Sequence, residues 1–151
     1  MEPVKIVVGA DHAGFELKTR VRVELEAEGH EVIDIGAFEY LKDDDYPDYA
    51  AAVARAIALG EGERGILICG SGVGACIAAN KIHGARACLC HDIYSATQGV
   101  EHDDMNILCL GGQIVGPALA SKLIAGFLGA QFIDEGRYRR RLDKTMALEK
   151  G

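Results

Sequence analysis

The stretch Gly65-Ile66-Leu67-Ile68-Cys69-Gly70-Ser71-Gly72-Val73-Gly74-Ala75 decides how this chain folds. An apolar run that ends at Cys69 is typical of a buried strand in a parallel sheet. The glycines that follow let a ligand approach the main chain closely, and the helical pattern over residues 76–81 directs unpaired N–H groups at the loop. The stretch therefore predicts a strand, a helix and, between them, an anion-binding loop with backbone groups from Gly70, Gly72 and Gly74.

The same alternation of strand and helix occupies the rest of the chain. Besides the run that ends at Cys69, strands are expected over residues 5–8, 32–35, 85–90 and 106–110. Helices are expected over residues 17–28, 48–59, 76–81, 93–100 and 117–128, with a charged C-terminal helix from Gly136. Strands that alternate with helices form a parallel sheet covered on both faces. We therefore predict an α/β protein in which residues 1–151 form one domain around a five-stranded parallel sheet.

Composition limits the classes of function. The formal net charge is −7, so the chain has no general attraction for nucleic acid. No uninterrupted apolar run approaches the ~18 residues of a membrane span, and the first residues lack the pattern of a signal peptide. We therefore expect a cytoplasmic protein without nucleic-acid or membrane partners.

The five cysteines are odd in number, and none of them forms a C-x-x-C pair. Cys69 lies beside the glycine loop, and the other four are expected to be buried, reduced thiols: Cys76, Cys88, Cys90 and Cys109. The histidines and cysteines show no metal-ligand spacing, so we expect no metal site.

Polar side chains follow three of the strands, at the edge where parallel α/β sheets bind ligands. They are Asp11 and His12 after the first strand, Cys69 and Ser71 after the third, and His91 and Asp92 after the fourth. A thiol beside a helix N-terminus is stabilised as a thiolate, which makes Cys69 a candidate nucleophile or general base. Structural roles stay open, since Asp11 can cap the next helix and Ser71 can satisfy loop N–H groups.

A basic cluster lies in the C-terminal helix. Arg137 and Arg141 are four residues apart, so they project from one face, and two guanidinium groups match one phosphate monoester. The alternative is a solvated helix face. His102 follows the helix expected over residues 93–100 and is either a hydrated loop residue or a functional one.

A dinucleotide-binding protein is the main alternative that the residues themselves leave open. Residues 70–75 match the G-x-G-x-x-A pattern between a strand and a helix, and Asp92 lies about 20 residues further on. Two observations weigh against this alternative. The pattern falls in the third strand–helix unit instead of the first, and little chain remains for a substrate domain.

The ordered motifs also resemble those of the type B ribose-5-phosphate isomerases, which are related to the subunits of galactose-6-phosphate isomerase. The resemblance covers nearly the whole chain and rests on residues 9–15, 45–47, 69–74, 78–81 and 94–96, and on Gly136, Arg137 and Arg141. It implies a three-layer αβα Rossmann-like fold and the interconversion of ribose 5-phosphate and ribulose 5-phosphate, in the pentose phosphate pathway, without a metal or cofactor. It also implies a homodimer or homotetramer with active sites shared between subunits.

The resemblance also implies a role for each site residue. Cys69 would be the base that moves a proton from carbon 2 to carbon 1, because the loop glutamate that some members use is Ala75 here. Ser71 and the loop N–H groups would hold the enediolate, Asp11 would move hydroxyl protons, and His102 would open the sugar ring. The implied substrate-binding residues are His12, Tyr46, Gly70, Gly72, Gly74, Asp103, Arg137 and Arg141, of which His12 and the two arginines bind phosphate.

Three positions depart from the family pattern. Asp103 stands where the family often has asparagine, Gln113 where an arginine is common, and Tyr138 where a histidine is frequent. The first two changes make the site more negative, so the substrate is either ribose 5-phosphate or another aldose, such as allose 6-phosphate or an unphosphorylated sugar. A sugar-phosphate-binding regulator without turnover is the remaining, non-enzymatic alternative.

Overall fold

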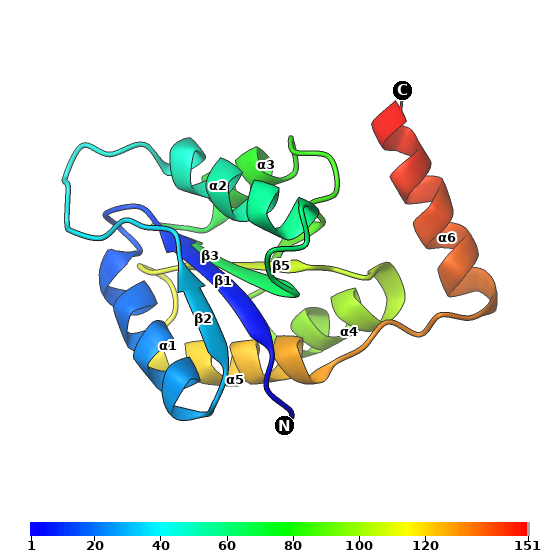
Figure 1. Cartoon of the computed structure of the whole chain (residues 1–151), viewed down its shortest axis with the longest axis horizontal. Coiled ribbons are helices and arrows are strands. Elements are labelled where there is room, and N and C mark those ends of the chain that lie inside the picture. The colour runs from blue at the N-terminus through cyan, green and yellow to red at the C-terminus, as the bar shows by residue number, and fades with distance from the viewer. Residues whose placement is uncertain (151) are drawn as a thin grey trace.

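The computed structural model describes residues 1–150 and has an all-parallel, five-stranded sheet at its centre (Figure 1). The strands lie in the order β2-β1-β3-β5-β4, with bounds β1 Lys5–Ala10, β2 Glu31–Asp34, β3 Arg64–Cys69, β4 Ala87–Leu89 and β5 Ile107–Gly111. The helices are α1 Phe15–Ala27, α2 Tyr46–Ala58, α3 Val73–Ala79, α4 Ile93–Asp103, α5 Pro117–Gly129 and α6 Gly136–Ala147. The predicted α/β class, parallel sheet and C-terminal helix are confirmed.

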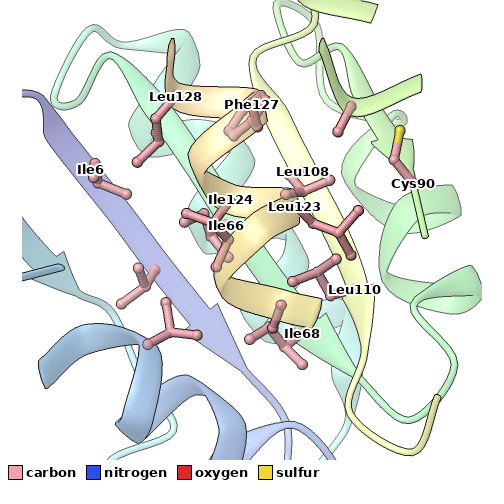
Figure 2. Close-up of a cluster of buried hydrophobic side chains, with 14 of the residues drawn as sticks. Ile6, Ile66, Ile68, Cys90, Leu108, Leu110, Leu123, Ile124, Phe127 and Leu128 are labelled. Carbon is pink, nitrogen blue, oxygen red and sulfur yellow. The ribbon is translucent and has the colours of Figure 1, made fainter. Parts of the chain in front are cut away.

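Each face of the sheet carries its own apolar core. Figure 2 shows the first, where alternate residues of β1, β3 and β5 pack against α5 and its neighbours, with Ile66, Leu108 and Phe127 almost completely buried. The second core joins the opposite face of the same strands to α2 and α3, and it includes Cys69. The structure is therefore the predicted three-layer αβα sandwich, and Cys69 belongs to the α2–α3 side.

Most elements differ from the prediction by one to three residues at their ends, as α3 does by beginning at Val73 instead of residue 76. β4 pairs only with β5 and keeps three residues, Ala87–Leu89, because it is an edge strand. α2 begins at Tyr46, two residues earlier than expected, since Asp45 is extended and Pro47 fits the first turn of a helix. α4 continues to Asp103 and ends where Asp104 adopts a left-handed conformation with φ of 52°. His102 is therefore helical and not a loop residue.

The order in which the strands are added to the sheet reverses between β1 and β3, which are parallel neighbours. From β1 the sheet continues through β2 to one edge, and from β3 it continues through β5 to the other. Ligands of open α/β sheets bind at such a switch point, outside the carboxyl ends of the strands. Gly14 lets α1 begin against this edge, because a Cβ atom there would lie 2.2 Å from the Ile68 carbonyl oxygen.

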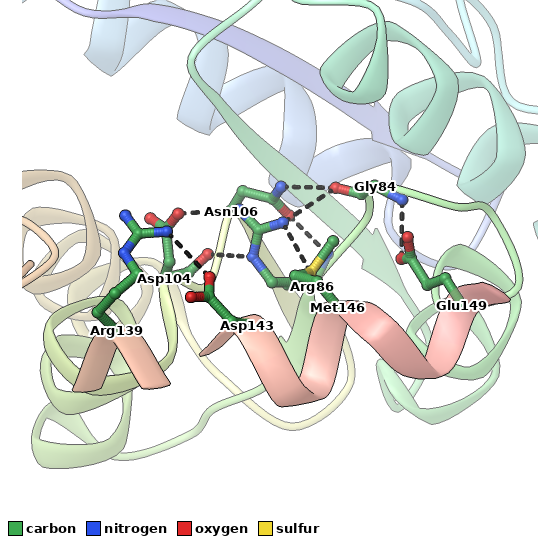
Figure 3. A network of polar contacts seen from close by, with 8 residues as sticks. All are labelled: Gly84, Arg86, Asp104, Asn106, Arg139, Asp143, Met146 and Glu149. Atoms are coloured by element: carbon green, nitrogen blue, oxygen red, sulfur yellow. Dashed lines mark hydrogen bonds and ion pairs between the residues drawn. The ribbon is translucent and has the colours of Figure 1, made fainter. Parts of the chain in front are cut away.

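Helix α6 stands apart from the sheet, on the side where β5 begins (Figure 1). Its apolar stripe docks on its own chain, with Leu142 buried and Tyr138 and Met146 half-buried. The polar contacts in Figure 3 anchor its last turns, where Arg86 donates to the Met146 sulfur at 3.5 Å. The Gly84 N–H donates to Glu149 Oε1 at 2.9 Å, in the short helix Leu148–Lys150 that follows. Within residues 1–150, no helix has both the length and the apolar character needed to cross a membrane.

Candidate active site

Cys69 is the last residue of β3 and is only 5% exposed. The Gly72 backbone N–H donates to its sulfur at 3.2 Å. This contact depends on glycine, because Gly72 has a φ of +83° and a Cβ atom there would lie 2.5 Å from the Leu89 side chain. The loop thus brings a backbone donor to the sulfur, which is the kind of interaction that stabilises an anion.

The glycine loop is clamped to the neighbouring strand end. The Gly112 N–H donates to the Cys69 carbonyl at 2.7 Å, and the Gln113 N–H donates to the Gly70 carbonyl at 3.0 Å. The exposed Ser71 hydroxyl accepts a bond from the Val73 N–H at 3.2 Å, so the structural role considered for Ser71 is present. Since a hydroxyl can accept and donate at once, Ser71 still has a proton to offer a substrate oxygen.

Asp11 lies at the end of β1, beside the end of β3. One carboxylate oxygen accepts bonds from the Ala13 and Gly14 N–H groups at 3.0 and 3.1 Å. The N-cap of α1 is Gly14, so Asp11 closes the turn before the helix and is not its N-cap. Burial raises the pKa of Asp11, against the opposing effects of the Gly14 N–H and His12. A carboxyl with a raised pKa suits a group that accepts and returns protons.

His12 is held by Asp44, which lies in the loop before α2. Asp44 Oδ1 accepts a bond from the His12 backbone N–H at 3.0 Å and lies 2.7 Å from the ring Nδ1. The bond to Asp44 raises the pKa of His12. Burial alone would raise the pKa of Asp44, but the bonds from His12 and Tyr49 outweigh it and lower that pKa. The sequence analysis missed Asp44, because a run of three aspartates between a strand and a helix indicates a solvated loop.

Asp11, His12 and Asp44 also form a group that could hold a metal ion. Within the part of the chain that the structure describes, their ligand atoms lie within 4.8 Å of one another. Sequence spacing could not predict this group, since Asp44 is 32 residues from His12. His12 Nδ1 and Asp44 Oδ1 lie 2.7 Å apart, which is a hydrogen-bond distance. A hydrogen bond between these two side chains is therefore enough to explain why they lie together.

Tyr46 lies against the glycine loop from the first turn of α2. A Cβ atom on Gly74 would lie 2.6 Å from the Tyr46 ring, so the glycine is what allows this contact. The structure thus brings one set of predicted residues together at the carboxyl edge of the sheet: Asp11, His12, Tyr46, Cys69, Gly70, Ser71, Gly72 and Gly74.

The remaining predicted residues form a second group. The His102 ring packs against Tyr138 with 4.5 Å between ring centroids, and its Nδ1 lies 3.0 Å from Gln98 Nε2. Arg137 lies over the same Tyr138 ring at 4.9 Å and donates to its hydroxyl at 3.0 Å. The exposed Arg141 follows one turn later on α6.

This second group lies away from Cys69. Helix α4 begins after the carboxyl end of β4 and runs back to the start of β5, so His102 and Asp103 lie at the amino edge of the sheet. Cys69 and Asp11 lie at the carboxyl edge. A single chain therefore presents the predicted site residues as two separate half-sites.

His91 and Asp92 have structural roles. His91 Nε2 accepts a bond from the Gly111 N–H at 3.1 Å and ties the end of β4 to the end of β5. Asp92 is the N-cap of α4 and accepts a bond from the Ser95 N–H at 2.7 Å. The acidic residue that dinucleotide binding requires is thus already engaged in capping, which weighs further against that alternative.

The expectation that four cysteines are buried is wrong for two of them. All five thiols are free, but Cys88 is exposed and Cys76 is half-buried. A hydrogen bond from the buried Cys109 lowers the pKa of Cys76 to about 7, and Cys90 does the same for Cys88. Chemical labelling of this protein will therefore reach thiols other than Cys69.

Comparisons with known proteins agree with this fold. The chain matches the family model of Ribose/Galactose Isomerase over residues 6–145. It is 46% identical over 145 residues to ribose-5-phosphate isomerase B of Escherichia coli strain K12, covering 96% of both chains. It is also 38% identical over 148 residues to D-erythrulose-4-phosphate isomerase 2 of Mycolicibacterium smegmatis, covering 97% of both.

The fold of this chain also matches that of a solved structure. Ribose-5-phosphate isomerase B of Mycoplasma genitalium, with bound ribulose 5-phosphate, superposes with a TM-score of 0.91 at 38% identity, covering 97% of this chain and 96% of that one. The fold and the relatives together define a sugar-phosphate isomerase. The chain belongs to the ribose/galactose isomerase family.

Proposed function

We propose that this enzyme interconverts ribose 5-phosphate and ribulose 5-phosphate through an enediolate, with Cys69 as the base. The observation that carries the proposal is the position of the Cys69 sulfur, buried at the switch point beside Asp11 and in contact with the Gly72 N–H. The names of the Escherichia coli and Mycoplasma genitalium relatives, and the ribulose 5-phosphate bound to the latter, support this substrate.

The reaction moves one proton between two carbons. The closed sugar has no acidic proton beside a carbonyl group, so His102 first helps to open the ring. The Cys69 thiolate then takes the proton from carbon 2, which leaves an enediolate, and the thiol returns it to carbon 1. Asp11 moves a proton between the two oxygens, as its raised pKa allows. Loop N–H groups and Ser71 hold the developing negative charge, in the manner of an oxyanion hole.

The phosphate requires positive charge at the far end of the substrate. His12 supplies it from the Cys69 half-site, and Arg137 with Arg141 supply it from the other half-site. Because these half-sites lie at opposite edges of one chain, a complete site needs the second half from another copy. Exposed apolar residues on α3, Val73 at 47% and Ile77 at 59%, lie next to the glycine loop and suit a subunit contact. We therefore include a homodimer with shared sites in the proposal.

Mixing two inactive variants tests the shared site. Cys69→Ala and His102→Ala each remove one half-site, so neither homodimer should turn over ring-closed ribose 5-phosphate at an appreciable rate. In a refolded equimolar mixture, half of the dimers are mixed and each has one intact site, so about a quarter of wild-type activity should return. If the mixture stays as inactive as its components, each site lies within one chain.

The choice of sugar is tested by comparing substrates. The proposal predicts that kcat/KM is highest for ribose 5-phosphate in a panel with allose 6-phosphate, D-erythrulose 4-phosphate and free ribose. D-erythrulose 4-phosphate is the specific alternative, because a 38% identical relative carries that activity in its name. Asp103 and Gln113 make the surroundings more negative than an asparagine and an arginine would, so free ribose belongs in the panel. A higher kcat/KM for any other sugar would replace ribose 5-phosphate as the substrate.

A further inference from the structure

The contact between His12 and Asp44 constrains the chemistry of the imidazole ring. Asp44 Oδ1 faces two groups at once, the His12 backbone N–H at 3.0 Å and the ring Nδ1 at 2.7 Å. The Asp44 side chain is 7% exposed, whereas the His12 side chain is 31% exposed. The carboxylate is thus the buried, fixed partner, and the ring is the part that can meet a ligand.

The bond to Asp44 determines which ring nitrogen can donate to a ligand. A carboxylate accepts only, so Nδ1 must carry a proton to bond with it. A neutral imidazole ring has one N–H group. When that proton is on Nδ1, the ring Nε2 carries a lone pair and can only accept a hydrogen bond, so it repels a phosphate oxygen. Nε2 can therefore donate only when the ring is an imidazolium. The pair makes phosphate recognition by His12 dependent on the protonated ring.

We propose that Asp44 is a positioning residue that keeps His12 as an imidazolium, with Nε2 as its one free donor to the substrate phosphate. The inference rests on the proposed function for the role of His12. It assigns to Asp44 a part in phosphate affinity that none of the sequence motifs indicates.

Other groups around His12 act in the same direction or are neutral. Asp11 and Asp43 add negative charge that also favours the imidazolium, although the bond to Asp44 is the largest cause of the raised pKa of His12. Tyr40 meets the ring edge-on with 6.1 Å between centroids. Burial, followed by the hydrogen bond to Asp44, raises the pKa of the Tyr49 hydroxyl, so this group carries no positive charge. The described contacts of His12 therefore include no cation that competes for Asp44.

Asp44→Asn removes the negative charge of the side chain at position 44 and keeps its size and shape. The His12 N–H still needs an acceptor, so the amide oxygen takes the place of Oδ1 and keeps the proton of a neutral ring on Nδ1. The charge that stabilised the imidazolium is gone, so the pKa of His12 falls. Nε2 then loses its proton at a lower pH, and phosphate affinity is lost earlier as the pH rises. Asp43→Asn removes an exposed neighbouring carboxylate without touching the ring, and is the matched control.

Two measurements test the assignment. NMR titration of the His12 ring in the free protein should give a lower pKa in Asp44→Asn than in the wild type or Asp43→Asn. Binding of glycerol 3-phosphate, a monoester that cannot isomerise, is then followed from pH 7.5 to 9, where its phosphate is almost entirely the dianion. At pH 7.5 its Kd should rise about tenfold in Asp44→Asn, the loss expected for one charge-assisted hydrogen bond. The KM for the sugar phosphate should rise with it, while kcat changes little.

The outcomes separate this inference from the proposed function. An unchanged His12 pKa in Asp44→Asn overturns it, and so does a lowered pKa with unchanged phosphate affinity. An equal effect of Asp43→Asn also overturns it, because general acidity of the loop would then be the cause. Failure of every sugar as a substrate would overturn the proposed function alone, since the titration and the glycerol 3-phosphate measurement require no turnover.

Discussion

Replacing Cys69 by alanine is expected to lower kcat for ribose 5-phosphate about a thousandfold, within the range that positioned acid–base groups contribute. The Cys69 sulfur is buried at the switch point and accepts a hydrogen bond from the Gly72 N–H at 3.2 Å, which favours its role as the base. Alanine removes the proton acceptor and leaves the loop in place, because glycine at position 72 and not the sulfur determines its conformation. Steady-state kinetics with the purified variant measures the effect.

Two controls distinguish loss of the base from loss of the site. The Kd for glycerol 3-phosphate should stay within about twofold of wild type, since His12 and the arginines are untouched. Cys88→Ala removes an exposed thiol whose pKa is lowered to about 7 by Cys90, and it should leave kcat unchanged. Retention of more than about a tenth of the activity in Cys69→Ala would show that another group is the base.

Lys18→Met is expected to lower the free energy of unfolding by about 3 kcal/mol, the loss typical of removing one partner from a buried ion pair. Lys18 is 2% exposed, donates to Asp34 Oδ1 at 2.9 Å, and also donates to the Ala37 carbonyl oxygen. It thus ties α1 to the segment that follows β2, and Ala37 in turn donates from its N–H to Ala10 at the end of β1. Methionine keeps most of the apolar stem but leaves Asp34 and the carbonyl without their buried partner.

Arg22→Met is the matched control, because Arg22 contacts the same Asp34 from an exposed position. Its Nη1 lies 3.5 Å from Asp34 Oδ2, and its side chain is 43% exposed. Surface pairs of this kind contribute little, so its loss should cost less than about 1 kcal/mol. Urea unfolding at one fixed protein concentration measures both variants, since the apparent stability of an oligomer depends on concentration. Equal losses of unfolding free energy in the two variants would mean that the burial of Lys18 does not make its contacts more stabilising than those of Arg22.

The sequence predicted the part of the site that follows from strand ends. An apolar run before Cys69 and a shorter one before Asp11 indicate two strands, and parallel strands place their carboxyl ends on one edge. The structure adds that β1 and β3 are direct neighbours, which places the two residues side by side. The order of the strands in the sheet could not be predicted from the sequence, because the same apolar pattern is compatible with every order of five buried strands.

Two features of the site were outside the reach of local patterns. Asp44 acts through a contact with a residue 32 positions earlier, so no spacing rule could distinguish it from the neighbouring aspartates. The separation of His102 from Cys69 depends on the length and direction of α4, which the sequence analysis ended at residue 100. Val100 is completely buried and Asp104 adopts the left-handed conformation, so the helix continues until that residue stops it.

The measurement that tests the central claim most directly is the fate of the transferred proton. Ribose 5-phosphate is converted in deuterated water by protein that has been freed of metal ions, and the product is analysed by NMR and mass spectrometry. Transfer through Cys69 predicts ribulose 5-phosphate with solvent deuterium at carbon 1, partial where the buried thiol returns the original proton before it exchanges. Cys69→Ala should form this product about a thousand times more slowly. Ribulose 5-phosphate formed with deuterium incorporation at an undiminished rate by Cys69→Ala would contradict the account.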